Sequence, residues 1–151
     1  MKRLIIEQSD DEFYTSHSGL ALAGACINRH SDLGRQVGRL SRGGGQIADI
    51  DILRSYLGLL CLGKSDFQAI TGMRDDDFFQ QALGIGRVPS TERLRQRLDE
   101  AAADGLIPLV FRSSQSMLKQ LGVKVSGYAD GHVPLDVEVC PQDNSNTRKE
   151  G

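Results

Sequence analysis

The chain has no tryptophan, few aromatic residues and no long apolar run. Aromatic residues make up 5% of the 151 residues, so any core must be built mainly from aliphatic side chains. The longest apolar-dominated segment, residues 50–62, carries Asp51 and Arg54, which excludes a membrane-spanning helix. Glu7 interrupts the apolar residues that follow the basic start, so an export signal is also lacking. We therefore expect a cytoplasmic protein with no membrane contact.

The cysteines and the overall charge exclude several function classes. Cys26, Cys61 and Cys140 are far apart, and no histidine stands at zinc-ligand spacing from them, so we expect reduced thiols. The net charge of −2 provides no general attraction to nucleic acid, so DNA binding needs local basic clusters. The length suits one compact domain.

Short helices account for most of the chain. Polar N-cap residues predict where helices begin, and glycines at 63, 84, 105 and 122 predict where they end. A glycine triplet at 43–45 separates two groups of helices. We expect helices over residues 18–28, 31–40, 49–62, 65–70, 75–83 and 92–103, and a last helix that stops at Gly122.

The helix over residues 49–62, which we expect Asp49 to cap, is predicted to be the buried central helix. Its apolar residues cover most of its circumference, which is typical of a helix enclosed by others. The predicted inner face consists of Ile50, Leu53, Leu57, Leu60 and Cys61, widened by Ile52, Tyr56 and Leu59. The predicted outer wedge is Asp51, Arg54, Ser55 and Gly58.

Near the carboxy terminus the pattern changes to that of a strand. Residues 133–139 alternate between apolar and polar side chains, with Leu135, Val137 and Val139 on one face. The predicted fold is therefore mainly α: a helical amino-terminal region, residues 1–126, followed by one β-strand in residues 127–151. Only residues 4–6 offer a second apolar stretch with which this strand can pair.

Asp136 and Glu138 are candidate catalytic and metal-binding residues. Two positions along a strand keep both carboxylates on one face, about 6.6 Å apart. Such a pair can bind a divalent cation together with acids from elsewhere in a chain. The alternative is a solvated acidic face of an ordinary strand, which the residues alone favour.

A helix with basic flanks is the candidate DNA-binding element. The segment 65–103 is predicted to form two helices, a turn and a third helix, and such a third helix can enter a DNA groove. The arginines concerned are Arg87, Arg93, Arg95 and Arg97. The alternative is an ion-paired surface, with Arg95 bound to Asp99 and Arg97 to Glu100. The residues alone favour this alternative.

Four segments resemble one family of proteins. Residues 51–70 (DILRSYLGLLCLGKSDFQAI), 74–90 (RDDDFFQQALGIGRVPS) and 94–98 (LRQRL) are similar to the amino-terminal helices of bacterial insertion-sequence transposases of the DDE group 1 type. Residues 134–151 (PLDVEVCPQDNSNTRKEG) resemble the entry of that family into its RNase H-like catalytic domain. The resemblance spans nearly the whole chain.

The resemblance implies metal-dependent DNA chemistry in the full-length family. It implies Mg²⁺ as cofactor, transposon-end DNA as partner, and strand cleavage and transfer as the reaction. The family strand reads Leu-Asp-Val-Asp-Val-Thr, with its second Asp as a metal ligand. Glu138 occupies that position here and Cys140 replaces the Thr. The longer side chain puts metal binding at Glu138 in doubt.

The family's other catalytic acids lie beyond Gly151. We therefore expect an amino-terminal fragment of a transposase with an incomplete RNase H-like domain and no catalytic activity by itself. The alternatives are a separate helix-turn-helix-like DNA-binding regulator and a remnant without function. The sequence leaves the oligomeric state open, a homodimer included.

Overall fold

The computed structural model describes residues 10, 14–40, 47–124 and 126–133. Within these ranges the chain is mainly helical, as the sequence predicts, and contains no strand. The predicted strand lies outside the described residues except for Val133, which is not in a strand. The predicted partner segment, residues 4–6, and the glycine triplet lie outside them as well.

Seven helices form the described part of the chain. They are α1 (Leu20–His30), α2 (Leu33–Leu40), α3 (Asp49–Cys61), the 3₁₀ helix η1 (Phe67–Met73), α4 (Asp77–Leu83), α5 (Thr91–Ala103) and α6 (Leu106–Leu121). The predicted bounds agree with these to within a few residues. None of these helices is long and apolar enough to cross a membrane.

Helix starts and stops follow the local chemistry with three exceptions. Asp76 and Ser90 accept hydrogen bonds from backbone amides in the first turns of α4 and α5, as the sequence predicts. Helix α1 begins after Gly19 rather than at residue 18, and Asp49, the expected cap, is the first residue of α3, after Ala48. η1 begins after Asp66 rather than at Ser65, because Asp66 accepts the Gln68 amide.

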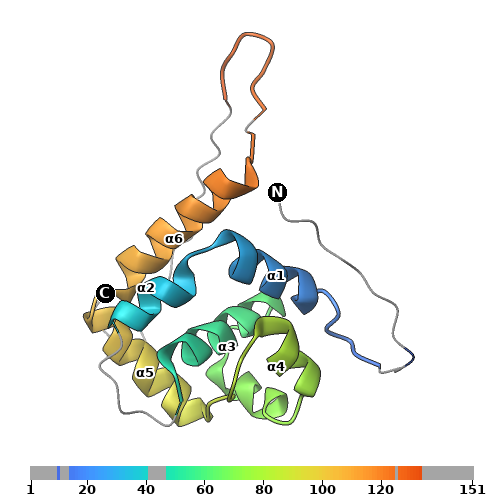
Figure 1. Cartoon of the computed structure of the whole chain (residues 1–151), viewed down its shortest axis with the longest axis vertical. Coiled ribbons are helices and arrows are strands. Elements are labelled where there is room, and N and C mark those ends of the chain that lie inside the picture. The colour runs from blue at the N-terminus through green and yellow to red at the C-terminus, as the bar shows by residue number, and fades with distance from the viewer. Residues whose placement is uncertain (1–9, 11–13, 41–46, 125, 134–151) are drawn as a thin grey trace, which may run out of the picture.

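The central position of α3 is confirmed. It packs against α1, α2, α4, α5 and η1, and Figure 1 shows it in the middle of the molecule. Its buried side chains join two clusters: Ile52 and Leu59 pack with η1, α4 and α5, whereas Leu53 packs with α2 and α6. One helix therefore links both halves of the core.

The predicted inner face of α3 is wrong in its orientation. Leu59 is fully buried, whereas Leu60 is 45% exposed and Cys61 is exposed. Ser55 and Gly58, which were assigned to the outer wedge, are buried. The reason is close packing: a Cβ on Gly58 would lie 2.4 Å from Leu83 Cδ1 and 2.8 Å from ring carbons of Phe79, so the glycine lets these side chains of α4 pack directly against α3.

Helix α6 lies along one side of the molecule. It starts at a corner formed by Gly105, whose φ of +90° reverses the chain after α5. Its inner residues Leu106 and Leu109 pack against α2 and α3, and its far end extends past the other helices in Figure 1. Pro108 is accommodated because it lies in the first turn, where its missing N–H has no helical partner.

Candidate nucleic-acid interface

The loop between α4 and α5 is fixed by buried side chains and by one carboxylate. Ile85, Val88 and Pro89 are buried, so they anchor the loop to the core. Asp51 Oδ2 accepts hydrogen bonds from the backbone amides of Gly86 and Arg87, both at 3.2 Å. Arg87 is thus held in an exposed position by a rigid backbone.

A second polar residue of α3 supports the start of the same loop. The guanidinium of Arg54 donates to the carbonyl of Gly84 and to Asn28 Oδ1 of α1. Gly84 has a φ of +65°, so it ends α4 in the left-handed conformation that glycine adopts without strain. Asp51 and Arg54, on the polar side of α3, therefore position the loop that carries Arg87.

Three arginines line one open cleft beside this loop. The cleft has a volume of about 560 Å³ and also borders Ser90, the N-cap of α5. Arg74 ends η1, Arg87 lies in the loop and Arg93 is in the first turn of α5. None of the three forms an ion pair with a carboxylate among the described residues. Their charges are available to an anion from solution.

The amino-terminal end of α5 adds to the positive potential of this cleft. The helix dipole places a partial positive charge at its first turn. Arg93 Nη1 contacts Gln96 Oε1 at 3.5 Å, so its guanidinium stays near the first two turns.

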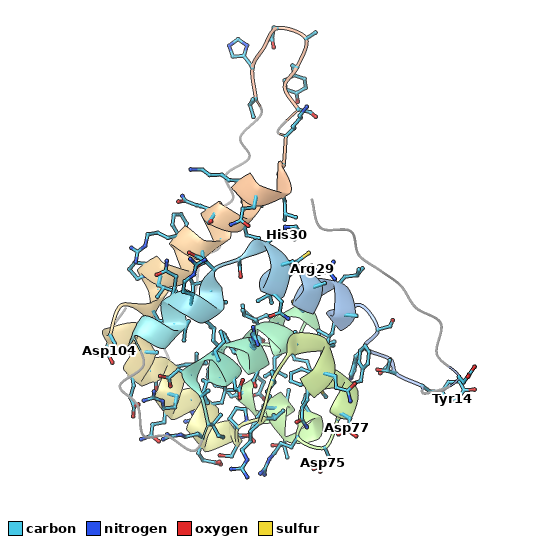
Figure 2. The ribbon with its side chains drawn as sticks, viewed as in Figure 1. Tyr14, Arg29, His30, Asp75, Asp77 and Asp104 are labelled. Atoms are coloured by element: carbon cyan, nitrogen blue, oxygen red, sulfur yellow. The ribbon has the colours of Figure 1, made fainter. Side chains whose placement is uncertain are left out.

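Two acids reduce the positive charge near the cleft. Glu92 lies in the first turn of α5. Its pKa is lowered first by hydrogen bonds with the backbone and Ser90, and then by the positive charges of Arg95 and Arg74. Asp75 is the acid in the lining of the cleft itself, and Figure 2 shows it at the outer edge of the molecule. The arginines outnumber the lining acid three to one, so the cleft remains positive.

The structure separates the predicted DNA-binding arginines. Arg87 and Arg93 line the cleft, and Arg95 is exposed on α5 outside its lining. Arg97 forms ion pairs with Asp49 and Glu100, and hydrogen bonds to these two carboxylates raise its pKa. The predicted Arg97–Glu100 pair is confirmed. The predicted Arg95–Asp99 pair is not formed within the described residues.

Sequence reasoning missed Arg74. Its neighbours Asp75, Asp76 and Asp77 make that segment acidic in sequence, which concealed its place in the cleft. The connection between α4 and α5 spans residues 84–90, longer than the three- to four-residue turn of a helix-turn-helix motif.

The predicted catalytic and metal-binding residues Asp136 and Glu138 lie outside the described residues. Among the described ones, no group of three histidine, cysteine or acidic side chains is placed to hold a metal ion. Comparison of the chain with protein-family models, curated proteins and solved structures found no match.

Proposed function

We propose that the helical region binds DNA as the amino-terminal part of an insertion-sequence transposase. The observation that carries the DNA-binding part is the cleft where Arg74, Arg87 and Arg93 meet the first turn of α5. The transposase part rests on the resemblance of residues 51–70 and 74–90 to that family. Metal chemistry would belong to Asp136 and Glu138, so the proposal for the described residues concerns binding alone.

The cleft suits the DNA backbone better than the base edges. Guanidinium groups bind phosphate oxygens in a bidentate manner, and a helix amino terminus accommodates the same anion. Arg74 and Arg87 come from segments other than α5, so the basic residues surround an open space rather than follow one helix. Contacts of this kind position a protein on a duplex and carry no sequence information directly.

Two single substitutions on α5 test this assignment. Arg93→Gln is expected to weaken binding to every duplex sequence and leave the melting temperature nearly unchanged, because Arg93 has no ion pair among the described residues. Arg97→Gln is expected to lower the melting temperature and leave DNA affinity nearly unchanged, because its charge is bound to Asp49 and Glu100. Fluorescence anisotropy with labelled duplex DNA and thermal unfolding measure the two effects.

Equal DNA affinities of the wild-type chain and the Arg93→Gln variant would refute the cleft as the DNA site. The transposase part is tested separately, by comparing duplexes from the ends of a related insertion element with scrambled duplexes of equal length. Tighter binding to the element ends supports the transposase part of the proposal. Equal binding to both sets of duplexes would contradict that part and would be explained by contacts with the DNA backbone alone.

A further inference from the structure

A second surface is apolar and lies away from the arginine cleft. Helices α3, α5 and α6 and the start of η1 enclose a groove of about 530 Å³. Its lining is apolar except at Asp99 and Ser114 and the Tyr56 hydroxyl, and includes Leu57, Leu60, Leu98, Ala102, Val110 and Phe111. The groove and the cleft share no lining residue.

A ridge of exposed apolar side chains follows α6 beside this groove. Ile107 is 68% exposed, Phe111 65% and Leu118 47%. Their spacings of four and seven residues place them on one stripe of the helix. Leu60, at 45% exposed, stands on the α3 side of the groove. Single exposed apolar residues are common in proteins, but a contiguous group beside an apolar groove marks an interaction surface.

The ridge and the groove are adjacent on the same face of one molecule. A two-fold axis that runs parallel to α6 brings the ridge of each molecule onto the groove of the other, so both contacts form at once. We propose that this face binds a second copy of the chain in that arrangement. Ile107 and Phe111 belong to both the ridge and the groove wall, and Phe111, the middle residue of the ridge, is the central anchor.

The charges at the edges of the face fit the same arrangement. Arg112 follows Phe111 by about 100° around the helix, so it lies on the flank of α6 that faces away from the groove. Asp99 borders the opposite wall, on α5. Ridge-into-groove packing places Arg112 opposite the partner's Asp99, and symmetry repeats the pair. Within the described residues neither side chain forms an ion pair, so both are available for this contact.

Sedimentation equilibrium of the full chain over a range of concentrations tests the proposal. We expect a reversible dimer with twice the monomer mass. Phe111→Glu should raise the dimer dissociation constant about thirtyfold or more, since it buries a charge at the centre of the contact. Leu22→Glu is the matched control: Leu22 is 62% exposed on α1, outside the groove, so this variant should dimerise as the wild type does.

A charge exchange tests the orientation of the two copies. Arg112→Asp alone should weaken the dimer, and adding Asp99→Arg in the same chain should restore it, because each pair is then reversed. A monomeric wild type at all concentrations would overturn the proposal, as would equal effects of Phe111→Glu and Leu22→Glu. Failure of the exchange to restore a dimer of folded chains, checked by circular dichroism, would overturn the ridge-into-groove arrangement. DNA binding is not involved in any of these measurements.

Discussion

Gly24 in α1 shows how a single residue without a side chain sets the packing of two helices. A Cβ at this position would lie 1.8 Å from the carbonyl oxygen of Ala82, so α1 and α4 are in backbone contact. Gly38 in α2 has no neighbouring atom within 4 Å of such a Cβ. Both are helical glycines in sequence, and only the packing distinguishes them.

Alanine substitutions at these two glycines should have opposite effects. Gly24→Ala is expected to lower the free energy of unfolding by about 3 kcal/mol or more, because a backbone atom cannot move aside as a side chain can. Gly38→Ala is expected to raise it by about 0.5–1 kcal/mol, since alanine favours the helix and meets nothing. Urea unfolding measures both, and a stable Gly24→Ala protein would contradict the close approach.

The arginines illustrate what local sequence can and cannot predict. The pairing of Arg97 with Glu100 follows from their spacing of three residues on a helix and is confirmed. The pairing of Arg97 with Asp49 joins positions that are 48 residues apart, so it depends on how α5 packs against α3. The place of Arg74 in the cleft depends in the same way on the packing of η1 against α5.

At the scale of elements, α3 was predicted correctly as the central helix and incorrectly as to which face is buried. Its apolar residues nearly encircle it, so hydrophobicity alone scarcely distinguishes one face from another. Two small residues lie on the buried side instead: Gly58 lets side chains of α4 come close, and Ser55 is fully buried. Leu57 and Leu60 were left to line the groove.

Substitutions of two leucines on α3 test this orientation. Leu59→Ala should lower the free energy of unfolding by about 2–5 kcal/mol, because Leu59 is fully buried and leaves a cavity. Leu57→Ala should cost only about 1–2 kcal/mol, since Leu57 is half-buried at the groove. Denaturant unfolding compares the two variants. A larger loss of unfolding free energy in Leu57→Ala than in Leu59→Ala would support the buried face that the sequence predicts.

Asp32 connects the segment between α1 and α2 to α6. Its carboxylate accepts hydrogen bonds from Gln36 Nε2 at 2.9 Å and from the buried Ser113 hydroxyl at 2.8 Å. These bonds, the Gln36 bond first, lower the pKa of Asp32 below its ordinary value of 3.8. Because the pKa is lower in the folded chain, the bonds stabilise the fold above that value and are lost as the pH falls below it.

The resulting pH dependence can be measured against an Asp32→Asn variant. The difference in melting temperature between the wild type and the variant should be constant above about pH 5 and should shrink below about pH 4, because Asp32 then takes up a proton in the unfolded wild-type chain before it does so in the folded one. Comparing the two proteins cancels the contributions of all other carboxylates. An unchanged difference at acidic pH would show that the Asp32 carboxylate has no such role.

At the scale of the whole molecule, the helices were predictable and their packing was not. Caps and glycine stops are local signals, so the bounds of α3, α4 and α5 agree with the sequence to within a few residues. The groove combines elements distant in the chain, and the cleft depends on how η1, the loop after α4 and α5 pack together, which no periodicity reveals. Arg87 and Arg93 were predicted as DNA-binding residues from their charge, but their common cleft was not.

The salt dependence of DNA binding tests the central claim most directly. Three phosphates neutralised by Arg74, Arg87 and Arg93 should give a log–log slope of affinity against salt of about −2.7 for duplex DNA, measured from about 50 to about 200 mM salt. Replacing all three by glutamine should bring that slope close to zero. The matched control is the triple variant Arg35→Gln/Lys64→Gln/Lys124→Gln. It has the same net charge as the triple variant of the cleft, but its substitutions lie outside the cleft lining, so it should keep the wild-type slope. A wild-type slope near zero, or an equal loss of slope in both triple variants, would contradict the account.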